Sequence, residues 1–358
     1  MKKYLLFLLI LPFIFLTACQ YNKKQITEIN KENLPIKEGY KEITEKIYLS
    51  DQIDTSYKEE LPFWDSKKGD KNTLVTAIQN FMGSDSEISE IIADKNPLTR
   101  LQKGKTRADI TVNKTGSWIR LTSDQASDLS HIFHNLRLDA IENNLNITDF
   151  KEELPFSKED SVDKVKQFLN TLQLGFDDYD YLIYAISKET LLEYLPTYER
   201  NAKELKGTKI AKDNLTDMYY ITVFPKLSDK RVIDGETQLG SSGEINFVHG
   251  PDLNFIITQT GIQGIDLAGV ILPTQKTDKM ATLSVQKGLD VLKEKYGNLI
   301  LDSPIYIESF TIEYIPIPTQ EKELYGGNLY RPFLIFKIKE KDRIDKIVID
   351  PTNWKEVS

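Results

Sequence analysis

The sequence has one cysteine, three histidines and fewer basic than acidic side chains. Because Cys19 has no partner cysteine, no intramolecular disulfide can form, and no thiol remains downstream for catalysis. The 46 Lys and Arg against 54 Asp and Glu give a formal net charge of −8, and a surface with that balance repels phosphate. Nucleic-acid binding is therefore not expected. No apolar run after residue 18 is long enough to span a bilayer.

The first 19 residues carry the clearest pattern. Lys2 and Lys3 precede an apolar run from Tyr4 to Phe15, and Leu16-Thr17-Ala18-Cys19 follows before the chain turns polar. This order predicts a secretory signal over residues 1–18, too short for a comfortable membrane span. The last four residues resemble the lipobox of bacterial lipoproteins. The resemblance implies that Cys19 becomes a lipidated N-terminus on the extracytoplasmic face of the cell membrane. An ordinary cleaved signal and a short anchor helix are the alternatives.

Length and composition suggest how the remainder is organised. About 340 residues follow the signal, more than one core usually organises, so at least two domains are expected. Residues 19–59 are rich in Lys, Glu, Asn and Gln, which favours a polar tether. A helical arm is the alternative, because Tyr40, Ile43 and Ile47 recur at helical spacing.

Residues 60–150 are predicted to form a small α+β module. A helix is expected near residues 73–82, a hairpin over residues 108–121, and a second helix from Ser123. The hexapeptide at residues 58–63 returns unchanged at residues 151–156. We interpret both copies as element boundaries containing proline, with an internal duplication as the alternative.

Two further segments each show one helix followed by three strands. In residues 151–270 Ser157 caps the helix, Gly175 is expected to end it, and strands follow at residues 179–186, 218–224 and 253–259. In residues 271–358 the helix is stopped by Gly297, and strands follow at residues 305–317, 333–339 and 346–350. The predicted fold class is α+β, with a helix packed on an antiparallel sheet in two units that follow the small module.

The last unit resembles a known family. Its closing stretch, Ile347-Val348-Ile349-Asp350-Pro351-Thr352-Asn353-Trp354, is similar to the Ile-Asp-x-x-Thr-Gly turn of the PepSY unit. Pro351 and Asn353 depart from that pattern, and Asn353 can still adopt the left-handed conformation that the glycine of the family supplies. Together with residues 219–266, the order resembles uncharacterised Firmicutes lipoproteins and extracytoplasmic regulators of a cell-wall histidine kinase. Similarity to these proteins implies an interaction with an envelope protein rather than turnover.

Histidines and carboxylates supply the few candidates for chemistry. His131 and His134 are three residues apart on the helix from Ser123, as two metal ligands could be, but the apolar stripe places them on its solvated side. His249 is expected in a loop without a partner. Asp177, Asp178 and Asp180 could divide acid and base roles, although an Asp-rich turn is common for local hydrogen-bonding reasons. No catalytic, cofactor-binding or metal site is predicted.

Aromatic residues are frequent at the start of the second unit. They could line a ligand groove, but strand positions favour the core. The set contains Phe176, Tyr179, Tyr181, Tyr184, Tyr219, Tyr220 and Phe224.

Three functions follow from the sequence. The favoured one is a non-catalytic interaction or regulatory module, tethered to the membrane through Cys19 and meeting an envelope protein partner. The second is a ligand-binding lipoprotein that serves a transporter or sensor. The third is an envelope hydrolase that uses the carboxylates at residues 177–180.

Overall fold

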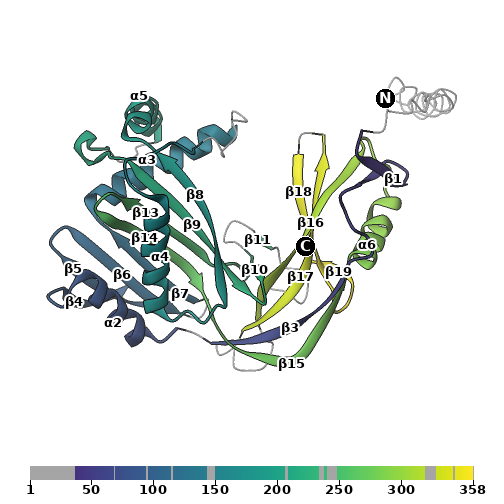
Figure 1. Cartoon of the computed structure of the whole chain (residues 1–358), viewed down its shortest axis with the longest axis horizontal. Coiled ribbons are helices and arrows are strands. Elements are labelled where there is room, and N and C mark those ends of the chain that lie inside the picture. The colour runs from purple at the N-terminus through teal and green to yellow at the C-terminus, as the bar shows by residue number, and fades with distance from the viewer. Residues whose placement is uncertain are drawn as a thin grey trace, which may run out of the picture.

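The chain forms an α+β structure in which helices pack on a large, mostly antiparallel sheet, as predicted. The computed structural model describes residues 37–67, 69–93, 96–113, 116–142, 150–205, 209–233, 238–239, 248–318, 328–341 and 343–357. Figure 1 shows two lobes, which we name lobe A and lobe B, joined by the long strands β3 (Lys58–Lys67) and β15 (Leu272–Ser284).

Lobe A is built on antiparallel strands that pair in the order β8-β9-β13-β14-β7-β6-β5-β4. These strands are β4 (Glu87–Ala93), β5 (Asn96–Lys103), β6 (Thr106–Asn113), β7 (Gly116–Thr122), β8 (Asp178–Ile186), β9 (Met218–Leu227), β13 (Asp252–Thr258) and β14 (Gly261–Val270). The predicted module of residues 60–150 and the predicted unit of residues 151–270 therefore share one sheet, because β7 pairs with β14.

Helices cover both faces of the lobe A sheet. Helices α2 (Lys71–Met82) and α4 (Lys158–Leu172) contribute to the larger core, and α3 (Asp124–Glu142) and α5 (Lys188–Leu205) contribute to a separate one. Neighbouring residues of β13 divide between the two cores: Phe255 packs on Phe168 of α4, and Ile256 belongs to the core of α3. This division is the alternation expected of a strand buried on both faces.

Lobe B is a single antiparallel meander, β16 (Ile305–Pro318), β17 (Asn328–Glu340), β18 (Arg343–Asp350) and β19 (Lys355–Val357), with helix α6 (Val285–Gly297) packed on it. Strand β2 (Ile47–Ser50) pairs with β16 in parallel and β1 (Tyr40–Thr44) pairs with β2. Both faces of the meander carry buried side chains, in two separate clusters.

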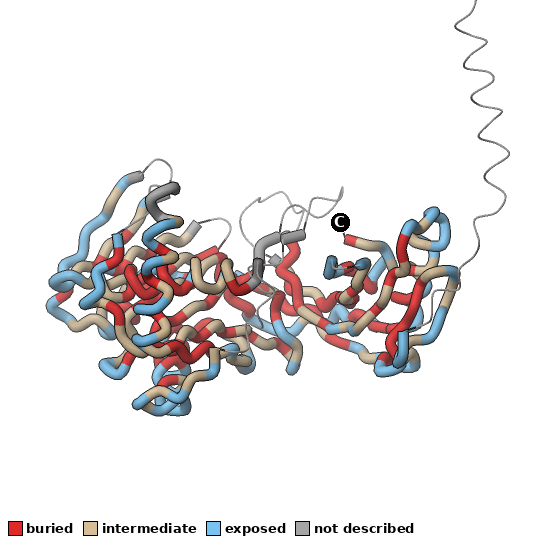
Figure 2. Tube along the Cα trace, turned by 90° about the horizontal axis from the view of Figure 1, so that it is seen from above, coloured by how far each residue is buried: buried red, intermediate tan, exposed pale blue. Residues whose placement is uncertain are grey.

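Two strand connections hold the lobes together. Strands β3 and β15 pair from Lys58 opposite Ser284 to Lys67 opposite Leu272. Strand β10 (Lys230–Val232) pairs with β9 of lobe A and with β16 of lobe B. Buried residues run from one lobe through this junction into the other (Figure 2). The short elements β11 (Gln238–Leu239), β12 (Val248–His249) and the 3-10 helix η2 (Lys212–Asn214) complete the described structure.

The same order of elements occurs three times along the chain. A helix is followed by four antiparallel strands in α2 with β4–β7, in α4 with β8, β9, β13 and β14, and in α6 with β16–β19. In the second of these units α5 and η2 are inserted between β8 and β9, and β10–β12 are inserted between β9 and β13. The sequence had indicated this order in only two segments, with three strands each. The first two units meet antiparallel through their fourth strands, β7 and β14.

Local signals explain where the helices begin and end. Ser157 accepts a hydrogen bond from the Asp160 amide and caps α4, as predicted, and α6 stops at Gly297, as predicted. Helix α4 ends earlier than expected: Gln173 takes the left-handed conformation, two residues before Gly175. A polar residue therefore supplies the left-handed cap that glycine was expected to provide.

The part of the predicted tether that the structure describes is folded. Residues 37–50 contain the strands β1 and β2. The alternative of a helical arm, suggested by the spacing of Tyr40, Ile43 and Ile47, is therefore wrong for this segment. Tertiary pairing outweighs the local pattern here, because every residue of β2 is buried and Ile47, Tyr48 and Leu49 pair with β16. Cys19 and the rest of the tether lie outside the described residues.

The two copies of the hexapeptide have different structures. Residues 58–63 lie inside strand β3, whereas residues 151–156 form the irregular segment that leads into α4. The boundary interpretation is therefore wrong for the first copy, in which Pro62 pairs opposite Met280 where the β3–β15 register shifts.

The closing turn also differs from the expectation. Trp354, not Asn353, has positive φ. Asp350 organises this turn by accepting hydrogen bonds from the amide and hydroxyl of Thr352, and its backbone carbonyl accepts from the Trp354 amide.

Candidate functional site

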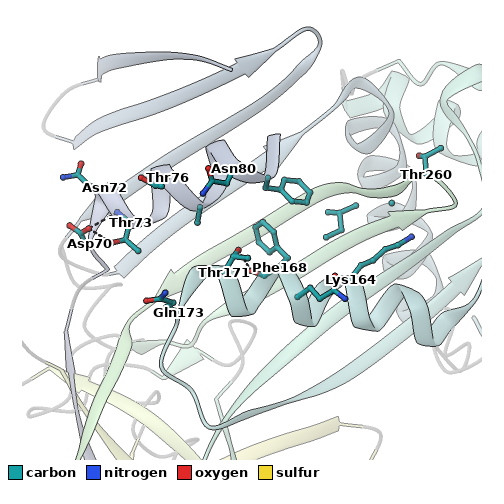
Figure 3. A pocket seen from close by; sticks show the side chains of 15 residues that line it. Asp70, Asn72, Thr73, Thr76, Asn80, Lys164, Phe168, Thr171, Gln173 and Thr260 are labelled. Carbon is teal, nitrogen blue, oxygen red and sulfur yellow. Dashed lines mark hydrogen bonds between the residues drawn. The ribbon is translucent and has the colours of Figure 1, made fainter. Parts of the chain in front are cut away.

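A groove of about 880 Å³ lies between α2 and α4 on one face of lobe A (Figure 3). It runs where the first and second units meet, and the turn between β13 and β14 closes one end with Thr260, Gly261 and Ile262. The groove is lined by residues 70–81, 164–173 and 260–262. These three segments are far apart along the chain, so no sequence pattern could predict that they lie together. The groove is thus a product of the pairing of two units.

Polar but uncharged side chains dominate the groove walls. Hydroxyl and amide groups come from both helices and from the turn: Asn72, Thr73, Thr76, Asn80, Gln167, Thr171, Gln173 and Thr260. Such groups donate and accept hydrogen bonds without the desolvation cost of a full charge. The groove is suited to a neutral ligand with alternating donors and acceptors.

Only two residues of the groove carry a charge. Asp70 caps α2: its carboxylate accepts from the Thr73 amide at 2.8 Å and from the Thr73 hydroxyl at 2.6 Å. These two hydrogen bonds, the hydroxyl first, lower the pKa of Asp70. Lys164 is exposed at the opposite wall. The Asp70 carboxylate is thus used in a helix cap, and the residues that line the groove include no histidine or cysteine.

Two aromatic side chains line the groove, one from each helix. The rings of Phe81 on α2 and Phe168 on α4 lie edge to face with centroids 5.0 Å apart. Phe168 is buried, whereas Phe81 is 41% exposed although it is a large apolar side chain. An exposed ring beside a polar wall gives the groove a place for an apolar group of a ligand.

A second cavity, about 400 Å³, lies between α3 and strands β6, β7, β13 and β14. Arg107, Arg120, His131 and His134 line it. Arg120 pairs with Asp266 at 2.9 Å, and Arg107 shares Asp109 with Arg100. The lining holds the two arginines Arg107 and Arg120 and the single carboxylate of Asp266, so it carries an excess of positive charge.

The two histidines of α3 lie where the sequence placed them, on its exposed side. His131 Nδ1 is 2.7 Å from the Ser127 carbonyl oxygen, which can only accept, so Nδ1 carries the proton and Nε2 is left for a ligand or water. Within the described residues, no three His, Cys, Asp or Glu side chains gather as a metal site. His249 is in the short strand β12 rather than in a loop.

The carboxylates at residues 177–180 have structural partners. Asp180 pairs with Arg231 at 2.6 Å and with Lys226 at 3.1 Å, and Asp177 accepts from the Ser228 amide at 2.8 Å. Burial acts to raise the pKa of Asp180, but the hydrogen bonds and charges of Arg231 and Lys226 outweigh it and lower that pKa. A carboxylate held ionised by two cations is poorly suited to act as a general acid.

Most of the aromatic residues at the start of the second unit belong to the cores or pack against them, whereas Phe224 lies outside them, below the Arg231 guanidinium. Tyr184 and Tyr219 are buried, and Phe176, Tyr179 and Tyr181 pack against the larger core of lobe A. Burial raises the pKa of Tyr181 to about 12. The aromatic residues that line the α2–α4 groove are Phe81 and Phe168 instead. In the sequence, the groove is indicated only by the Thr and Asn residues on the exposed side of α2.

Comparisons with known proteins show the fold. No family model and no curated protein matches the chain. An uncharacterised protein from Eubacterium rectale, solved at 1.45 Å, has a TM-score of 0.57 at 11% identity, with 89% of this chain and 92% of that chain covered. The Bacillus megaterium YpeB C-terminal domain has a TM-score of 0.32 at 11% identity, with 82% and 97% covered, too low to support a fold assignment. In the part of the chain that the structure describes, no helix has the length and hydropathy needed to cross a membrane.

Proposed function

We propose that the protein is a non-catalytic interaction module of the cell envelope. In this proposal Cys19 carries the lipid that holds the chain at the extracytoplasmic face of the membrane, and the α2–α4 groove binds an extended segment of a partner protein. The three helix-plus-four-strand units would be PepSY-like. The observation that carries the proposal is the groove, with its uncharged donors and acceptors around the exposed Phe81.

An extended polypeptide fits this groove better than a small molecule does. Most of the wall residues are exposed, including Thr76, Asn80 and Thr171, so a small ligand would stay in contact with water over much of its surface. Small-molecule sites usually bury about 70–90% of a ligand. A peptide instead needs amide and hydroxyl partners for its backbone and one apolar contact for a side chain.

Crosslinking in living cells tests the proposal. A photoreactive amino acid at Thr76, inside the groove, is compared with one at Glu193, an exposed position on α5. We expect a discrete adduct from residue 76 only, whose crosslinked peptide can be identified by mass spectrometry.

A second change makes the test specific. Phe81→Asp keeps α2 folded, because Phe81 is 41% exposed, but places a charge against Phe168. The adduct at residue 76 should then fall at least about tenfold, the loss expected when one well-packed contact of about 1.4 kcal/mol is removed. The same adducts from residues 76 and 193, or an adduct unaffected by Phe81→Asp, would contradict peptide binding in the groove.

The second cavity favours a second candidate function, a ligand-binding lipoprotein that serves a transporter or sensor. Arg107 and Arg120, which line the same cavity, would bind a small anion. Calorimetry with inorganic phosphate and with succinate is the test. Binding to the parent chain that disappears in Arg120→Gln would support this candidate, and heats equal to those of buffer dilution would rule it out for these anions.

A further inference from the structure

The end of lobe B that carries the loop between α6 and β16 exposes apolar side chains to an unusual degree. Leu299 is 55% exposed and Ile300 98% exposed, and Ile344 of β18 is 53% exposed. Ile300 therefore leaves almost its whole side chain in water. Single exposed apolar residues are ordinary on protein surfaces, but two consecutive ones at a loop tip with a third on the neighbouring turn call for a physical reason.

These residues lie at one end of the lobe B sheet. Residue Ile305 pairs opposite Glu340, and Ile344 pairs opposite Lys339, so the loop before β16 and the turn between β17 and β18 are neighbours. The Ser303 hydroxyl donates to the Glu340 carboxylate at 2.6 Å and ties the two segments together. The loop is thus held in place, with its apolar tip directed outward.

The turn between the first two strands of the described chain, β1 and β2, lies at this same end. The Lys46 ammonium donates to the Leu301 carbonyl at 2.5 Å, and the Lys46 carbonyl accepts from the Ile305 amide at 2.9 Å. The Lys37 ammonium is 5.6 Å from the centre of the Tyr306 ring. Figure 1 shows β1 beside α6, away from lobe A. The described chain therefore begins in lobe B, in the strand pair β1–β2 whose turn at Lys46 contacts the loop that carries Leu299 and Ile300.

The anchor alone does not force this end onto the membrane. Eighteen residue steps separate Cys19 from Lys37, and a fully extended chain of that length spans about 60 Å. A lipid at Cys19 would keep lobe B within that distance of the bilayer in any orientation. One orientation is favoured over the others by the exposed apolar side chains, which lose contact with water only when lobe B faces the bilayer.

We infer that Leu299 and Ile300, with Ile344 beside them, insert into the lipid surface and orient the molecule with lobe B toward the membrane and lobe A away from it. The inference rests on the proposed lipid at Cys19. Lys46, Lys341 and Arg343 near the tip are balanced by Asp302, Glu340 and Asp345, and Arg343 pairs with Asp345 at 2.8 Å. Contact is therefore made by apolar insertion rather than by attraction to anionic headgroups.

The single cysteine of the chain makes the test direct. A thioether at Cys19 cannot react with a maleimide, so the purified full-length lipoprotein with Ile300→Cys labels with an environment-sensitive fluorophore at residue 300 alone. The matched control is Ile92→Cys, since Ile92 is 86% exposed and lies on β4 at the far side of lobe A (Figure 1). Both proteins are reconstituted into phosphatidylcholine vesicles with and without a lipid that carries a spin-label quencher.

The expected result is quenching at residue 300 at least about twice that at residue 92, as for an apolar side chain that enters the acyl boundary. It should change little when anionic lipid is added. Equal quenching at the two positions would overturn the inference. A blue shift at residue 300 in detergent without vesicles that grows with protein concentration would also overturn it, because a second copy would then cover the tip.

The proposed lipid anchor is tested separately, by maleimide labelling and vesicle flotation of the parent chain. If the parent chain labels with maleimide at Cys19 and does not float with vesicles, the proposed lipid is absent and the inference fails with it. If the parent chain floats but residue 300 is not quenched, the anchor stands and only the inference about the tip is wrong.

Discussion

Lobe A and lobe B use the same helix-plus-four-strand unit but present different surfaces. In lobe A two units join through β7 and β14, which brings α2 beside α4 and creates the groove. In lobe B one unit stands alone, and β1 lies beside α6 where a second helix would be. A single unit provides a covered sheet, whereas a pair of units also provides a groove. The binding surface thus depends on how units are joined.

The largest effect should come from the two cores. Phe336 in lobe B and Phe255 in lobe A are both fully buried, so replacing either with alanine should lower the free energy of unfolding by about 3–5 kcal/mol. The strand pairings β3–β15 and β9–β10–β16 join the lobes, so the two lobes should unfold together. Each substitution should therefore move a single unfolding transition of the whole protein to lower urea concentration. Urea unfolding, followed by tryptophan fluorescence and by circular dichroism, measures this. Two resolved transitions, each sensitive to one substitution only, would show that the lobes fold separately.

A buried ion pair distinguishes lobe B. Asp350 is 4% exposed and pairs with Arg331, so Asp350→Asn should cost about 3 kcal/mol by leaving the guanidinium without its partner. The exposed pair of Asp85 with Lys103 in lobe A is the control, and Asp85→Asn should cause no measurable change. Thermal unfolding compares the two proteins. Equal effects would mean that burial does not set the strength of the Arg331 pair.

The seam between the units can be opened at one residue. Gly116, at the start of β7, has φ +132°, and an added Cβ would lie 2.8 Å from the Gly269 carbonyl carbon of the adjoining segment. Gly116→Ala should therefore destabilise the protein by about 2–3 kcal/mol through strain and overpacking. Gly104→Ala, where the Cβ meets nothing within 4 Å, should cost only about 1–2 kcal/mol. Amide hydrogen exchange in β7 and β14 should rise in the first protein only; unchanged exchange would contradict the role of this contact.

The smallest effect concerns pH at the connection between the lobes. Asp180 of β8 pairs with Arg231 of β10, which in turn pairs with β16. Because the folded-state pKa of Asp180 is lowered, its contribution to stability is complete above the unfolded-state pKa and is lost as the pH falls through the folded-state pKa. Asp180→Asn should thus cost less than about 1 kcal/mol at pH 7, since the pair is partly exposed, and the cost should decrease as the pH is lowered toward 2. A difference between the two proteins that stays constant from pH 7 to pH 2 would contradict this account.

Sequence patterns located the elements whose signals are local. The structure confirms the helix predicted after Ser157, the helix end at Gly297 and the strands β16 and β17. Each of these predictions depended on apolar periodicity or on a capping residue within a single element. The pairing of β3 with β15 could not be predicted in this way, because it joins Lys58 to Ser284. Strand β14 carries two internal glycines, Gly264 and Gly269, which are unfavourable in strands, and so it was not recognised.

The sequence by itself determined the composition limits, the lone cysteine at Cys19, the α+β class and the order of helix and strands in two units, because periodicity and capping are properties of short segments. Only the tertiary structure decided that the predicted module is a third such unit, that it joins the second through β7 and β14, and that α2 and α4 thereby enclose a groove. Those outcomes depend on contacts between residues far apart in the chain, and no local pattern specifies which strand edges meet.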